Sequence, residues 1–211
     1  MIDEKDLNLK AQMLVSIISM EEYLGWIKES IPRMVVIDRE REIGLNKLFK
    51  INKDKGIDIT VDYPRSFMIS YVPKLLYNSY ILILWSLFEE KINTLTNDWK
   101  LADYWASYEL TIDDIKHPWL ERVEMFWLHH FYEGEEHQSL RALRYIRNVI
   151  AHDDSKTNDK ETAKWIKYLS TKGFDIFDEG EVRSNEEFCL WAYKVIKDLL
   201  QSIIVFTMVE K

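Results

Sequence analysis

The chain has 211 residues, enough for one domain with an extension and enough to bury a core without disulfide bridges. Apolar residues make up 47% of it and aromatic residues 13%, with only six Gly and four Pro, which favours long packed helices over a turn-rich β fold. The formal net charge of −8 excludes a surface that is basic overall, so a polyanion could bind only at a local basic patch.

Cysteine usage and hydropathy indicate a reducing, aqueous compartment. The one cysteine, Cys189, cannot form an intramolecular disulfide, and its apolar neighbours predict that it is buried. The charged N-terminus MIDEKDLNLK lacks the apolar region of a secretory signal. The most apolar runs, residues 80–88 and 199–209, are shorter than the ~20 residues of a membrane span. We therefore expect a soluble cytoplasmic protein that does not contact the membrane.

The first 100 residues predict two long helices and a connector. Apolar residues at spacings of three and four predict a helix over residues 4–31 that ends before Pro32. Residues 33–64 predict a short helix at most, followed by turn formers and a β-branched run. A central core helix is expected from residue 66 to about residue 100, with Pro73 as its start or a kink. Residues 1–65 are thus interpreted as a helical extension that packs on a bundle formed by residues 66–211.

The rest of the chain predicts four more helices and a hairpin. Helices are expected over residues 118–134, 135–151 and 159–171, and a hairpin over residues 172–183 around a Glu179-Gly180 turn. Ser184 and Glu187 have the spacing of a capping box before the last helix. The predicted fold class is all-α: an antiparallel helical bundle, with a four-helix core plus the N-terminal helix, and a small β-hairpin before the last helix.

One stretch reverses the acidic character of the chain. Between His137 and His152 the sequence holds Arg141, Arg144 and Arg147 at helical spacing and no acidic residue. This stretch is where we expect a polyanion to bind.

The segment RNVIAHD (147–153) closes the same predicted helix and combines three useful groups. Asn148 and His152 are four residues apart and share a helix face, so the amide can orient the imidazole. Arg147 lies five residues before His152, about 140° around an ideal helix, and flanks it. The set supplies a side chain that ordinarily titrates near neutrality, a permanent cation whose fork matches phosphate, and a positioning amide.

RNA cleavage needs little more than these groups. The 2′-hydroxyl must lose a proton as it attacks its own phosphate, the 5′-oxygen must gain one, and charge on the phosphate must be stabilised. His152 suits the proton transfers and Arg147 the charge, with no metal or other cofactor. The reaction needs both a general acid and a general base, and each protomer supplies only one imidazole at this site. We therefore expect a two-fold dimer that brings two such helix ends into one composite site.

A purely structural interpretation stays open for the same residues. A histidine at a helix C-terminus followed by Asp153 and Asp154 also fits a partner of the helix dipole or a capping group.

Placed at the end of an amphipathic helix in an all-α bundle, RNVIAHD resembles the Arg-x4-6-His motif of the HEPN superfamily, in which a polar residue often follows the arginine. Residues 80–95 (YILILWSLFEEKINTL) resemble the preceding core helix of that family, and the likeness spans residues 66–209. It implies a metal-independent, dimeric endoribonuclease, often a toxin or an anti-phage effector, with Arg147, Asn148 and His152 at the motif positions. Members that bind RNA or nucleotides without cutting leave open a non-catalytic binding or regulatory module.

The resemblance also bears on neighbouring residues and on partners. We expect RNA as substrate, held by Arg141 and Arg144, together with a second copy of the chain and an antitoxin or regulatory protein. Glu89 is the acid that we expect to hold Arg147 from the core helix, and Asp153 is the acid next to the histidine. Where toxins paired with a nucleotidyltransferase carry a tyrosine two residues after the histidine, this chain has Asp154. Modification of such a tyrosine cannot apply here.

Two other features of the sequence bear on a metal site and on the aromatic residues. The cluster His129, His130, Glu133, Glu136 and His137 includes an i, i+4 pair that could bind a metal, but Gly134 is expected to interrupt its helix, so no metal is predicted. Trp85, Trp165 and Trp191 are expected in the core, whereas Trp99 and Trp105 flank a polar stretch and suit an interface or RNA stacking.

Overall fold

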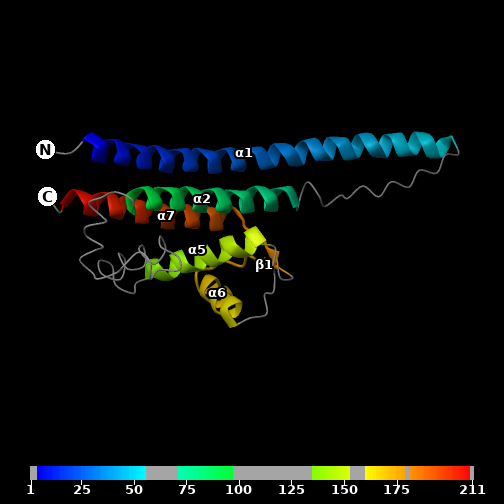
Figure 1. Ribbon diagram of the computed structural model, residues 1–211. Helices are drawn as coiled ribbons and strands as arrows, with labels where there is room; N and C mark the ends of the chain where they lie inside the picture. The colour runs from blue at the N-terminus through cyan, green and yellow to red at the C-terminus, as the bar shows by residue number, and fades with distance from the viewer. Residues whose placement is uncertain (1–3, 56–70, 97–134, 153–159, 179–180, 210–211) are drawn as a thin grey trace.

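The computed structural model describes residues 4–55, 71–96, 135–152, 160–178 and 181–209, and within them the chain is all-helical apart from one small hairpin. The elements are α1 (Glu4–Asp54), α2 (Val72–Thr96), α5 (Glu135–His152), α6 (Lys160–Thr171), β1 (Phe177–Asp178), β2 (Glu181–Val182) and α7 (Glu186–Val209). Figure 1 shows three layers: α1, then α2 with α7, then α5 with α6 beyond it. The predicted all-α bundle is confirmed.

The core lies where these layers meet. One side of α1 contributes Met13, Ile17, Met20, Leu24 and Ile27, each at most 6% exposed. They pack with α2 and α7 residues at helical spacing, among them Tyr80, Leu84, Phe88, Phe188, Ala192 and Ile196. The first helix therefore shares the core of the bundle.

The expected helix end before Pro32 is wrong, because α1 continues through Pro32 to Asp54. A proline inside a helix removes one backbone hydrogen bond and crowds the preceding turn, a local cost of about 3 kcal/mol. Here Ile31, directly before the proline, packs against the core, and Val35, four residues later, is partly buried. Packing of the turns before Pro32 helps to offset its local cost, and most of the expected connector is helix.

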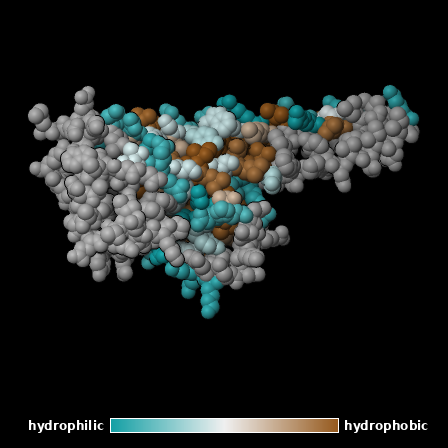
Figure 2. All heavy atoms as spheres, in the orientation of Figure 1, coloured by the Kyte–Doolittle hydropathy of each residue, from teal (hydrophilic) through white to brown (hydrophobic). Residues whose placement is uncertain are grey.

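A second side of α1, about 120° from the buried one, is also apolar. Leu7, Leu14, Ile18, Val36 and Ile43 are 45–58% exposed, and their spacings of 4, 7 and 18 residues keep them close to one line along the helix. Figure 2 shows apolar atoms among hydrophilic ones along this helix. None of the described helices is long and apolar enough to cross a membrane.

The predicted hairpin is present between α6 and α7. Strands β1 and β2 pair antiparallel, with Phe177 opposite Val182 and Asp178 opposite Glu181. Asn78 of α2 fixes it to the bundle, because its amide donates to the Val182 carbonyl at 3.0 Å and its oxygen accepts from the Ser184 N–H at 3.2 Å.

The N-cap of α7 lies one residue later than the predicted capping box. The cap of α7 is Asn185, whose Oδ1 accepts from the Phe188 N–H at 2.9 Å, whereas the Ser184 hydroxyl is buried without a hydrogen-bond partner among the described residues. Asparagine and serine are about equally good N-caps, so the sequence pattern did not separate them.

The remaining predictions concern the start of α2, the bounds of α5 and α6, and the helix expected over residues 118–134. Pro73 stands in the first turn of α2 and so starts the helix rather than kinking it. The structure gives α5 and α6 the predicted bounds to within one residue. The expected helix over residues 118–134 lies outside the described residues.

Candidate active site

Burial of one face of α5 determines where the motif side chains lie. Leu140, Leu143 and Ile146 are at most 2% exposed and pack in the core beside α2 and α7. Arg147 follows Ile146 and therefore lies at the edge of this buried face, next to α2. The helix thus presents the Arg147 guanidinium at an interhelix seam, where a carboxylate of α2 can reach it.

The carboxylate that reaches Arg147 is Glu89. Arg147 Nη2 lies 3.8 Å from Glu89 Oε2, and each side chain is 26% exposed. Arg147 Nη1 also donates to Asn148 Oδ1 at 3.0 Å, while Nε is buried and has no hydrogen-bond partner among the described residues. The guanidinium is thus oriented at both terminal nitrogens, and because the side chain is 26% exposed, an anion in solution can still reach it.

Glu89 is itself held in place. Its Oε1 accepts a 2.8 Å hydrogen bond from the indole N–H of Trp85, one turn earlier on α2, and Trp85 is only 1% exposed. The two Glu89 oxygens therefore face different partners, Trp85 and Arg147. The sequence predicted Trp85 as a core residue but missed this role, although its i, i+4 spacing to Glu89 was a usable sign.

His152 lies apart from this arrangement. It is exposed and is the last residue of α5. Within the part of the chain that the structure describes, no hydrogen bond joins it to Asn148, whose oxygen accepts from Arg147 instead. The expected orientation of the imidazole by Asn148 is therefore not seen, because the charged Arg147 donor competes for that amide. Asp153 lies outside the described residues.

The remaining arginines extend the basic surface. Arg144 is partly buried and Arg141 is exposed, and Arg141 lines a groove that α5 forms with α6. The lysines of α6 on the other side of this groove were not among the predicted site residues. Their spacing of four and three residues in KETAKWIKYLST, which places them on one helix face, could have identified them.

The alternative metal cluster is not tested by the structure. His129, His130 and Glu133 lie outside the described residues, as do the side chains of Glu136 and His137. Elsewhere in the described residues, no three His, Cys, Asp or Glu side chains are grouped to hold a metal ion.

The expected core tryptophans are found inside, with Trp165 4% exposed and Trp191 partly buried, and Trp99 and Trp105 lie outside the described residues.

No protein-family model matches the chain, and neither the curated proteins nor the solved structures include a significant match. The chemistry of the site is therefore argued from its own residues.

Proposed function

We propose that the chain is a metal-independent endoribonuclease of the HEPN type, with Arg147 and His152 as its catalytic residues. The observation that carries this proposal is the held guanidinium of Arg147, five residues before an exposed histidine at the helix end. A purely structural ion pair would need only the contact to Glu89. The additional bond to Asn148 orients the guanidinium, and its partial exposure leaves it accessible to a further anion.

The reaction follows from these groups. The RNA 2′-oxygen attacks the adjacent phosphorus, its proton passes to a neutral His152 imidazole, and the bond from phosphorus to the 5′-oxygen breaks. A second, protonated imidazole gives a proton to the leaving 5′-oxygen. The products are a 2′,3′-cyclic phosphate and a 5′-hydroxyl end. Arg147 binds the non-bridging oxygens, where negative charge develops in the transition state.

The second imidazole comes from a second copy of the chain in this mechanism. An isologous two-fold contact at the C-terminal end of α5 brings each His152 next to its symmetry mate. Pairing through the exposed apolar stripe of α1 would not do so, because the α2–α7 layer separates α1 from α5 (Figure 1). The composite site therefore requires an interface on the α5 side of the bundle.

As the HEPN resemblance implies, we propose that the chain is a cytoplasmic toxin or defence effector. An antitoxin or a regulatory protein would then restrain its activity.

The first experiment compares wild type, Arg147→Ala and His152→Ala on total RNA in excess EDTA. We expect cleavage by the wild type alone, with 2′,3′-cyclic phosphate and 5′-hydroxyl ends, from a protein with the solution mass of a dimer. Cleavage that survives His152→Ala would exclude the proton-transfer role, and loss of cleavage in EDTA would exclude the metal-independent mechanism.

A mixing experiment tests the composite site. Equal amounts of wild-type and His152→Ala subunits, unfolded and refolded together, would assort into about one quarter wild-type dimers. If both imidazoles of one cleft are required, activity falls to about one quarter of that of the same total amount of wild type. Independent sites would retain about one half, and that result would contradict the composite site.

A second candidate function is a non-catalytic module that binds RNA, a nucleotide or a protein through the same surface. One observation favours it: His152 has no orienting hydrogen bond among the described residues, while Arg147 remains well placed to bind an anion. No cleavage of any RNA by wild type, combined with binding that requires Arg147, would favour this function.

A further inference from the structure

We infer that the groove between α5 and α6 binds the phosphate backbone of a single RNA strand and leads it to Arg147. This inference rests on the proposed function and names the substrate-binding surface of the same site. The groove has a volume of about 500 Å³ and is lined by residues of both helices: Gln138, Arg141, Lys164, Trp165, Lys167, Tyr168 and Thr171.

The charge of this lining is the first argument. Arg141, Lys164 and Lys167 contribute three cations, and none of the lining residues is acidic. Such a lining stands out in a chain whose formal net charge is −8. A polyanion that enters this groove meets three cationic side chains and no carboxylate of the lining.

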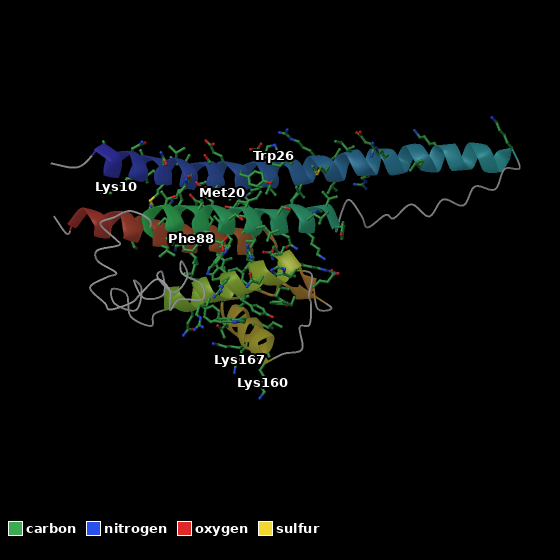
Figure 3. The ribbon with its side chains drawn as sticks, in the orientation of Figure 1. Lys10, Met20, Trp26, Phe88, Lys160 and Lys167 are labelled. Atoms are coloured by element: carbon green, nitrogen blue, oxygen red, sulfur yellow. The ribbon has the colours of Figure 1, made fainter. Side chains whose placement is uncertain are left out.

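The lysines share one face of α6. Lys160, Lys164 and Lys167 follow spacings of four and three residues, which place them on the same side of the helix. Figure 3 shows Lys160 and Lys167 at the edge of the molecule farthest from α1. The Lys164 ammonium lies 4.5 Å from the centre of the Trp165 ring, so this lysine has a defined position beside the groove.

The arginines of α5 connect the groove to the motif. Arg141, Arg144 and Arg147 are three residues apart, so each is turned by about 60° from the last and shifted by about 4.5 Å along the axis. They form an oblique row that starts in the groove at Arg141 and ends at the guanidinium held by Glu89. The phosphates of a strand bound in the groove can therefore follow this row of arginines, so that the reacting phosphate lies at Arg147.

The lining favours a phosphate backbone over a protein partner. Protein interfaces depend on exposed aromatic or large apolar anchors, whereas the Trp165 ring in this groove is 4% exposed. Of the uncharged groups, the exposed amide of Gln138 can bond to phosphate or ribose oxygens. The hydroxyls of Tyr168 and Thr171 are already bonded within the protein, to Ser139 and to the Tyr168 carbonyl.

The test measures binding separately from cleavage, in a His152→Ala background. The probe is a fluorescein-labelled single-stranded RNA of about 16 nucleotides, at the upper end of the range of strand-binding sites, and its Kd is measured by anisotropy over a series of salt concentrations. The groove variant carries Lys160→Gln, Lys164→Gln and Lys167→Gln. The control variant carries Lys47→Gln, Lys50→Gln and Lys55→Gln, which remove the same charge from exposed positions on or just beyond the distal part of α1. Circular dichroism and thermal melting establish that both variants fold.

We expect the groove variant to weaken RNA binding more than about tenfold at low salt and to lower the slope of log K against log salt by about 2, since each phosphate contact contributes about 0.7. The control variant should change Kd by less than about threefold. Equal weakening by both variants, or by neither, would overturn the inference.

Two further outcomes separate this inference from the proposed function. If the groove variant binds RNA normally while cleavage by otherwise unmodified protein still needs Arg147 and His152, the groove inference is wrong and the proposed function stands. If no variant binds RNA but a labelled polyglutamate binds and depends on the α6 lysines, the groove serves an acidic protein partner, and both proposals are wrong.

Discussion

Replacing Glu89 by glutamine tests whether the carboxylate positions Arg147 for the reaction. Glu89 contacts the Trp85 indole through one oxygen and faces Arg147 at 3.8 Å through the other. Glutamine keeps an oxygen that can accept from the indole, so the main loss is the charge opposite Arg147.

The stability cost of Glu89→Gln should be small. Exposed ion pairs contribute about 0.2–1 kcal/mol, and this pair, with each side chain 26% exposed, belongs at the upper end of that range. A loss of about 1 kcal/mol corresponds to a fall in Tm of about 2–4 °C for a chain of this size. Glu89→Ala would also leave the buried indole N–H without its charged acceptor, which adds about 1.5–3 kcal/mol.

The effect on cleavage should exceed the effect on stability. A guanidinium released from Glu89 samples positions that miss the transition-state charge, so we expect single-turnover cleavage to fall about tenfold or more. The assay pairs single-turnover rates at saturating protein with urea unfolding. Glu90→Gln is the matched control, because Glu90 is 64% exposed and pairs with Lys91 instead.

Cleavage by Glu89→Gln at the rate of Glu90→Gln would refute the positioning argument. A double-mutant cycle of Glu89→Gln with Arg147→Ala adds a second check, since a real pair should show a coupling of about 0.5 kcal/mol or more in unfolding. Full additivity in that cycle would mean that the two side chains do not interact in solution.

Other predictions concern the site, the core and the caps. Arg147→Lys keeps the charge but loses the fork, so cleavage should fall more than about tenfold in the EDTA assay. Burial raises the pKa of the Cys189 thiol, so the native protein should react with a thiol reagent far more slowly than the protein in guanidinium, and rapid native labelling would contradict this burial. Phe88→Ala, at a position that is 0% exposed, should cost about 3–5 kcal/mol in urea unfolding. Asn185→Ala should cost about 1 kcal/mol through loss of the α7 cap, whereas Ser184→Ala, which removes a buried hydroxyl with no hydrogen-bond partner in the described part of the chain, should cost less.

Periodicity was sufficient to predict the helices that pack on the core. The apolar stripe of α5 predicted both its bounds and its buried face, and the turn around residues 179–180 predicted the β1–β2 pair. Pro32 misled the prediction because its local cost was given more weight than the packing of the turns that precede it. A helix that is fixed by packing before a proline can accommodate the local cost, and that packing is a tertiary property.

The contact between Glu89 and Arg147 depends on how α2 is rotated relative to α5. Helical spacing shows that Glu89 lies on the same element as the buried Phe88, but it does not show which side of α2 faces α5. That side is determined by Trp85, which is buried and draws the Glu89 carboxylate toward the seam through its indole N–H. A rule that considers one helix at a time cannot supply this arrangement.

The orientation of Asn148 shows the same difficulty within one helix. Its position four residues before His152 allows a bond to the imidazole, and its position next to Arg147 allows a bond to the guanidinium. The structure has the second bond, at 3.0 Å, because a charged donor is the stronger partner for an amide oxygen. A phosphate that binds Arg147 would compete for the same guanidinium and could release the Asn148 oxygen toward His152. RNA binding would then complete the orientation of the imidazole, so Asn148→Ala should lower the rate of the bound complex more than its affinity for RNA.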